Sequence, residues 1–169
     1  TVSPSNTLPS HVSMLTGFLP ARHGITWDDY LPAKGAIKVP TIFLAARKAG
    51  LRTAIVAGKE KFNTFRENGE MDVFVGGARL DADVADQAVA QLYAGVDLLF
   101  VHLPDVDLSG HATSWMSNAY KNKVAKADEA LAACGLDAST LPTVFTSSTG
   151  DPLNCHLLCE ALATAERLV

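Results

Sequence analysis

The sequence predicts an α/β fold in which a mostly parallel sheet is flanked by helices. Three apolar runs have the length and composition of buried strands: "RTAIVA" (52–57), "DLLFVHL" (97–103) and "PTVFTSS" (142–148). Helical patterns separate these runs, and such alternation is typical of a parallel sheet covered by helices. We expect the strands near 52–57 and 97–103 to be central, and functional residues to gather where strands end and loops begin.

The helices are placed by their start and stop signals. Pro9 suits the first turn of a helix over "SHVSMLT", because its missing N–H is not needed there, and Gly17 ends that helix. Three further helical stretches are "VPTIFLAARKAG" (39–50), "DADVADQAVAQLYAG" (81–95) and "SWMSNAYKNKVAKADEALAACG" (114–135). A short strand, "DVFV" (72–75), precedes two glycines.

Composition excludes several classes of protein. The 169 residues include 14 basic and 18 acidic side chains, and this net charge of −4 does not predict a nucleic-acid surface. The longest apolar runs are too short to span a bilayer. Three cysteines cannot all pair within one chain, which favours a reducing, cytoplasmic compartment. The oligomeric state is not predicted, and both ends of the chain look cut.

A cluster of possible metal ligands follows the strand at 97–103. Asp105, Asp107 and His111 lie within seven residues in "HLPDVDLSGHATSW". Zinc takes carboxylate and imidazole ligands, and a tight backbone at Gly110 would let the two types converge on one cation. The alternative is a polar loop with His111 on the surface. A metal site at Cys155 and Cys159 is disfavoured, because no second ligand pair follows them.

The second candidate site is the start of the helix near Pro9. Thr7 lies just before this helix, where free backbone N–H groups attract anions such as phosphate. A threonine hydroxyl is a poor nucleophile unless a base or a metal lowers its pKa. The alternative is that Thr7 or Asn6 merely caps the helix. Lys59 follows a strand and is either an anion contact or a surface lysine, and His23 is expected to be structural.

Two motifs in this order resemble the type I phosphodiesterase/nucleotide pyrophosphatase branch of the alkaline phosphatase superfamily. They are "TLPSHVSMLTGFLPARHGI" and "DLLFVHLPDVDLSGH", and the resemblance covers residues 1–130. It implies an alkaline-phosphatase-like core and a small-molecule phosphoester substrate. It also implies that Thr7 is the nucleophile, Ser10 contacts the substrate, and Asp107 and His111 bind a divalent metal, usually zinc. Sulfatases are disfavoured, because their first motif position must be Cys or Ser.

The chain departs from the family pattern at the second metal. The family has a metal-binding aspartate upstream of the threonine motif, and this chain begins too late to contain it. A later Asp–His pair is replaced by Ser148 and Thr149 in "TSSTG". The intact family binds two metals, whereas only one partial site is predicted here. The resemblance therefore implies a catalytically incomplete fragment of a metal-dependent hydrolase.

The tail has a different resemblance. Residues 129–169 are similar to the N-terminal region of β-ketoacyl synthase-like proteins, so we divide the chain into a phosphodiesterase-like part (1–130) and a strand–helix tail (131–169). The two parts meet near 129–138, through either a natural gene fusion or an error of sequence assembly. Two alternative functions stay open at this point: a ketosynthase-related fragment, and a non-catalytic α/β module.

Overall fold

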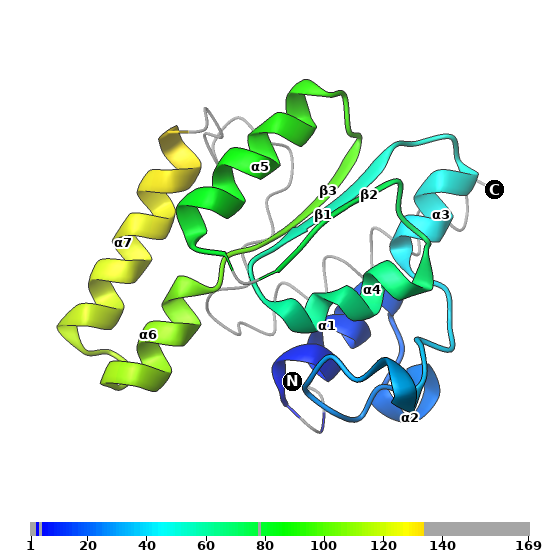
Figure 1. Ribbon diagram of the computed structural model, residues 1–169, viewed down its shortest axis with the longest axis horizontal. Coiled ribbons are helices and arrows are strands. Elements are labelled where there is room, and N and C mark those ends of the chain that lie inside the picture. Colours follow the sequence, from blue (N-terminus) through cyan, green and yellow to red (C-terminus); the bar gives the residue numbers. More distant parts are fainter. Residues whose placement is uncertain (1–2, 4, 78, 134–169) are drawn as a thin grey trace.

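The computed structural model describes residues 3, 5–77 and 79–133, which form the predicted α/β fold (Figure 1). Its strands are β1 (Thr53–Ala57), β2 (Val73–Val75) and β3 (Leu98–His102). Its α-helices are α1 (Thr7–Thr16), α2 (Pro20–His23), α3 (Ile42–Lys48), α4 (Asn63–Asn68), α5 (Asp81–Tyr93), α6 (Asp105–Thr113) and α7 (Asn118–Ala133). Two 3-10 turns, η1 (Pro32–Lys34) and η2 (Glu60–Phe62), complete the described part. No helix in these described residues is long and apolar enough to cross a membrane.

The three strands form a parallel sheet in the order β2-β1-β3. Ile55 of β1 lies between Phe74 of β2 and Phe100 of β3, and every residue of β1 is buried. The prediction that β3 is also central is wrong for the described residues, where β1 is its one neighbour. Its first four residues are accordingly only half-buried. An apolar run indicates burial of a strand, but it does not show how many strands lie beside it.

Helices cover both faces of the sheet. In Figure 1, α1, α3 and α4 lie on one side of the strands, and α5 lies on the other side with α7 outside it. The first face holds the main apolar cluster, which includes Leu8 and Val12 of α1 and Ile55 of β1. Side chains alternate along a strand, so Ala54 and Val56 of β1 belong to the opposite face, where α5 contacts the strand.

The helix boundaries agree with the sequence signals in part. Gly17 ends α1 in the left-handed conformation, as predicted. Helix α7 begins at Asn118 rather than 114, because Ser114 and Met116 have positive φ angles of 83° and 64° that are incompatible with a helix. The predicted strand at 142–148, Ser148, Thr149 and the segment with Cys155 and Cys159 lie outside the described residues.

Two buried aspartates and a partly exposed lysine join three helices beside the sheet. Asp81 is the first residue of α5, and its Oδ1 accepts a hydrogen bond of 2.8 Å from the backbone N–H of Asp105, the first residue of α6. Asp105 Oδ2 in turn pairs with Lys123 Nζ of α7 at 2.7 Å. Asp81 Oδ2 and Asp105 Oδ1 are buried and have no hydrogen-bond partner among the described residues. Burial raises the pKa of Asp81, and the neighbouring charge of Asp105 adds to this effect.

This arrangement predicts that Asp81 makes stability depend on pH. A carboxyl group whose pKa is higher in the folded state stabilises the folded state at pH values below its ordinary pKa, near 3.8. This stabilisation is lost as the pH rises through the pKa of the folded state. An asparagine at this position could still accept the Asp105 N–H but cannot ionise. We expect Asp81→Asn to raise the melting temperature at pH 7 and to lose this advantage at pH 3. A difference between the two proteins that is the same at both pH values would contradict the prediction.

Candidate active site

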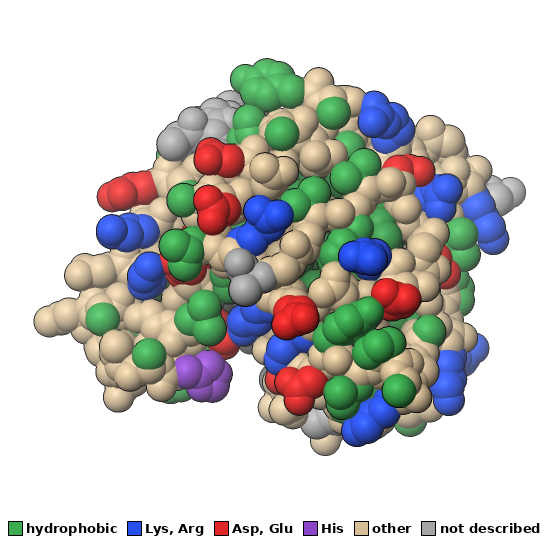
Figure 2. Space-filling model, viewed as in Figure 1, with side chains coloured by type: hydrophobic (Ala, Val, Ile, Leu, Met, Phe, Trp, Pro, Cys, Tyr) green, Lys and Arg blue, Asp and Glu red, His purple; other side chains and the backbone are tan. Residues whose placement is uncertain are grey.

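An open cleft of about 580 Å³ lies between α6 and the N-terminal turn of α1. In Figure 2 the surface is hollowed between these two parts of the molecule, with acidic and basic side chains along the hollow. Its lining residues come from α1, the segment after α2, the segment after β1, and α6. They are Thr7, Asp28, Asp29, Tyr30, Gly58, Lys59, Glu60, Lys61, Asp107, Leu108 and His111.

Thr7 is the first residue of α1 rather than the residue before it, and His11 fixes its turn. The Nδ1–H of His11 donates a hydrogen bond of 2.7 Å to the Thr7 carbonyl oxygen. The other side of the His11 ring packs against Phe62 and His102, with ring centroids 5.1 and 5.3 Å away. Burial lowers the pKa of His11 and lowers that of His102 to about 3, so both imidazoles are neutral packing groups at neutral pH. They tie the Thr7 turn to the end of β3.

Two other polar residues of the first motif lie away from the cleft. Ser10, expected to contact the substrate, is half-buried in α1 and is not among the residues that line the cleft. His23 is fully buried: its Nδ1 accepts the Ile25 N–H at 3.1 Å, and its Nε2 lies 3.0 Å from Ser13 Oγ. The expectation that His23 is structural is therefore confirmed.

Asp107 and His111 lie one turn apart on α6, not in the loop that the sequence suggested. Asp107 Oδ1 and His111 Nε2 are 3.7 Å apart, and both residues line the cleft. Gly110 does not bend the backbone here, because it is part of the helix. A Cβ at this position would lie 2.4 Å from the ring of Trp115, so the glycine provides space for that indole. Trp115 also packs edge-on against the His111 ring.

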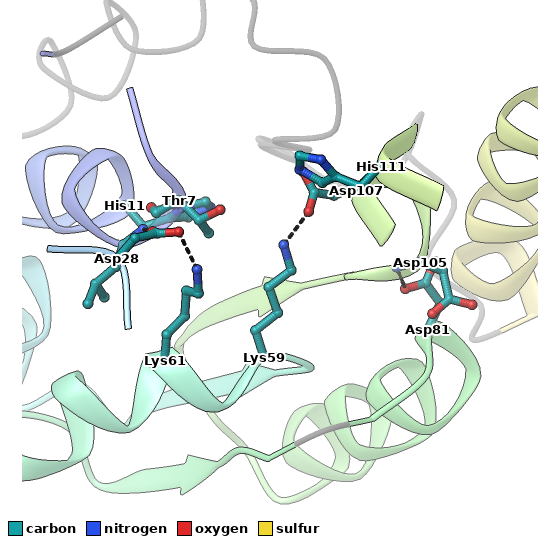
Figure 3. A network of polar contacts seen from close by, with 10 residues as sticks. Thr7, His11, Asp28, Lys59, Lys61, Asp81, Asp105, Asp107 and His111 are labelled. Atoms are coloured by element: carbon teal, nitrogen blue, oxygen red, sulfur yellow. Dashed lines mark hydrogen bonds and ion pairs between the residues drawn. The ribbon is translucent and has the colours of Figure 1, made fainter. Parts of the chain in front are cut away.

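Two lysines enter the cleft from the segment that follows β1. Figure 3 shows Lys59 extending to Asp107 of α6, and Lys61 extending to Asp28 beside Thr7. Lys59, a possible anion contact from sequence, therefore pairs with a protein carboxylate. The sequence did not single out Lys61, although it lies two residues after Lys59 in "GKEKF". It did not single out Asp28 either.

Comparison with known proteins identifies the family. Residues 1–134 match the family model for type I phosphodiesterase / nucleotide pyrophosphatase. The chain belongs to this family. The match ends close to residue 130, where the sequence resemblance also ended. No curated protein sequence gives a significant match.

Solved structures share the fold of this phosphodiesterase-family chain. Murine ectonucleotide pyrophosphatase / phosphodiesterase 5 is 16% identical, with a TM-score of 0.59 over 78% of this chain and 42% of that one. Phosphonoacetate hydrolase from Sinorhizobium meliloti 1021, in complex with phosphonoformate, is 22% identical, with a TM-score of 0.55 over 79% of this chain and 43% of that one. The present chain therefore spans about two fifths of the length of these proteins.

Two residues in the cleft suit a divalent metal of the kind on which this phosphodiesterase family generally depends. Zinc ligands about 2.0–2.2 Å from the ion lie roughly 3.3–3.6 Å apart at a tetrahedral angle. The 3.7 Å between Asp107 Oδ1 and His111 Nε2 is close to this spacing. Among the described residues, however, no three His, Cys, Asp or Glu side chains gather to hold a metal. Asp107 and His111 are therefore at most two ligands of a site that the described residues do not complete, and Asp107 already pairs with Lys59.

We predict weak zinc binding that depends on Asp107. Isothermal titration calorimetry should detect binding that disappears in Asp107→Ala and persists in Asp29→Ala, which removes a carboxylate from the same cleft. Lys59→Met should tighten binding by up to about fivefold, because a partly exposed ion pair is worth about 0.2–1 kcal/mol. Unchanged zinc affinity in Asp107→Ala would show that the ion binds elsewhere.

Proposed function

We propose that this cleft is the nucleophile-bearing part of a phosphoester hydrolase site, with Thr7 as the nucleophile. The observation that supports this most is the placement of Thr7, Lys59, Asp107 and His111 around one cleft. They come from three segments that are far apart in the sequence: α1, the segment after β1, and α6. Murine ectonucleotide pyrophosphatase / phosphodiesterase 5 is named as inactive in a threonine-to-alanine variant in complex with AMP, which is consistent with a catalytic threonine in this fold.

The proposed reaction has two steps in which Thr7 is used and restored. Its hydroxyl oxygen forms a bond to phosphorus as the bond to the leaving alcohol breaks, and the proton of Thr7 ends on that alcohol. Water then adds to the phosphothreonine, which releases phosphate or a phosphomonoester and returns the hydroxyl. The chain's part is to orient Thr7 through the His11 contact and to hold the phosphoryl group in front of it.

The charges of the cleft support a requirement for a cation. Four carboxylates and two ammonium groups line it, a formal charge of −2 that would repel a phosphoester. Asp107 and His111 would hold a divalent metal, for which we propose zinc. Such an ion acts as a Lewis acid that neutralises phosphoryl charge and lowers the pKa of a nearby hydroxyl. Lys59, when released from Asp107, could then contact the phosphoryl oxygens.

A transition-state analogue tests the role of Thr7 without complete turnover. We expect vanadate to bind the zinc-loaded chain, detected by ⁵¹V NMR, because its vanadium accepts a nucleophilic oxygen. Thr7→Ser keeps the hydroxyl and should keep this binding, whereas Thr7→Ala should weaken it by roughly 100-fold, about 2.7 kcal/mol.

Equal vanadate binding by Thr7→Ala and Thr7→Ser would contradict a nucleophilic role. Release of nitrophenol from bis(4-nitrophenyl) phosphate should stay at background for the 169-residue chain alone, since no group of three possible metal ligands gathers among its described residues. Vanadate binding is therefore a more direct measurement of the role of Thr7 than nitrophenol release.

A further inference from the structure

Asp28 occupies a position at the edge of the cleft that is suited to an external anion. Its Oδ1 accepts the backbone N–H of Leu8, the second residue of α1, at 2.8 Å. Its Oδ2 accepts a hydrogen bond from Lys61 Nζ (Figure 3). The carboxylate therefore uses both of its oxygens to bind two positive groups directly beside Thr7.

Each of these two groups would otherwise favour a phosphoryl oxygen. The first N–H groups of a helix have no partner within the helix, and the partial positive charge of the helix end favours anions. The side chain of Asn6 does not cap α1, and the first turn of α1 contains no acidic residue. Lys61 is mostly buried, with 17% of its side chain exposed, so its ammonium group is held close to this helix end.

We propose that Asp28 determines specificity for the charge of the substrate, so that the cleft favours phosphodiester monoanions over phosphomonoester dianions. The proposal rests on the proposed function, because it assumes that a phosphoryl group binds in front of Thr7. A carboxylate beside that group repels a dianion about twice as strongly as a monoanion, because Coulomb energy is proportional to charge. It also accepts the Leu8 N–H and offsets the charge of the Lys61 ammonium, so both groups attract additional phosphoryl oxygens less strongly.

The chain offers a matched control for this residue. Asp29 is the next residue, lines the same cleft and is exposed to solvent. Among the described residues it has no ion-pair partner, whereas Asp28 contacts both Leu8 and Lys61. Asp28→Asn and Asp29→Asn change the net charge of the cleft by the same amount. Any difference between the two variants therefore reports the position and contacts of Asp28 rather than the net charge of the cleft.

Two non-hydrolysable ligands that differ by one charge test the proposal by calorimetry on the zinc-loaded chain at pH 8.5, because the metal offsets the negative charge of the cleft. Phenylphosphonate is the dianion, and its monomethyl ester is the monoanion. We expect Asp28→Asn to bind phenylphosphonate roughly tenfold more tightly than the unsubstituted chain and the ester roughly threefold more tightly, since the free-energy change scales with ligand charge. Asp29→Asn should change either affinity by less than about threefold, because exposed charges are screened. Adding Lys61→Met to Asp28→Asn should reverse the gain for the dianion.

The outcomes distinguish this inference from the proposed function. The amide oxygen introduced by Asp28→Asn can still accept the Leu8 N–H, so circular dichroism and thermal melting should confirm that this variant keeps α1 folded. Equal effects of Asp28→Asn and Asp29→Asn, or an equal gain for both ligands, would overturn the proposal. So would weaker binding of phenylphosphonate by Asp28→Asn. None of these results depends on Thr7 acting as a nucleophile, which the vanadate experiment tests separately.

Discussion

The close approach of Gly58 to Pro104 determines how the two walls of the cleft meet. Gly58 follows β1, and a Cβ on it would lie 2.5 Å from the proline ring that precedes α6. Its N–H donates to the His102 carbonyl at 3.1 Å, and its own carbonyl accepts the Arg79 N–H at 3.2 Å. Because Gly58 has no side chain, the segment with the two cleft lysines can pass directly beside the start of α6. A larger residue would push Lys59 away from Asp107.

Opposite charges meet across this narrow junction. Lys59 connects the segment after β1 to α6, and Lys61 connects it to Asp28 beside α1. Each lysine is mostly buried, with 14% and 17% of its side chain exposed, which makes these pairs less screened than surface ion pairs. The excess of carboxylates in the cleft nevertheless leaves it suited to a cation before an anion can enter.

The sequence predicted the features that depend on local chemistry. The parallel α/β fold followed from the apolar runs and their spacing, and the helix that Gly17 ends followed from Pro9 and Gly17, although it begins at Thr7, earlier than predicted. The motif around Asp107 and His111 identified residues that do lie in the cleft. Its helical conformation was missed, because Gly110 suggested a turn, whereas that glycine in fact accommodates the ring of Trp115.

Features that depend on tertiary contacts could not be predicted from one sequence. Asp28 stands in an irregular segment, and only the fold brings its carboxylate to the N–H of Leu8, 20 positions earlier. Ser10 was linked to the substrate by resemblance alone, yet it is not among the residues that line the cleft. The edge position of β3 in the described sheet depends on which strands lie beside it, and its own apolar residues do not encode this.

The central claim is that a metal held by Asp107 and His111 shares one site with Thr7. Paramagnetic broadening by Mn²⁺ measures this directly, because the effect falls steeply with distance from the ion. We predict that substoichiometric Mn²⁺ broadens the methyl resonance of Thr7 together with the ring resonances of His111, and that Asp107→Ala removes both effects. A Thr7 methyl signal that stays sharp while the His111 signals broaden would contradict the account.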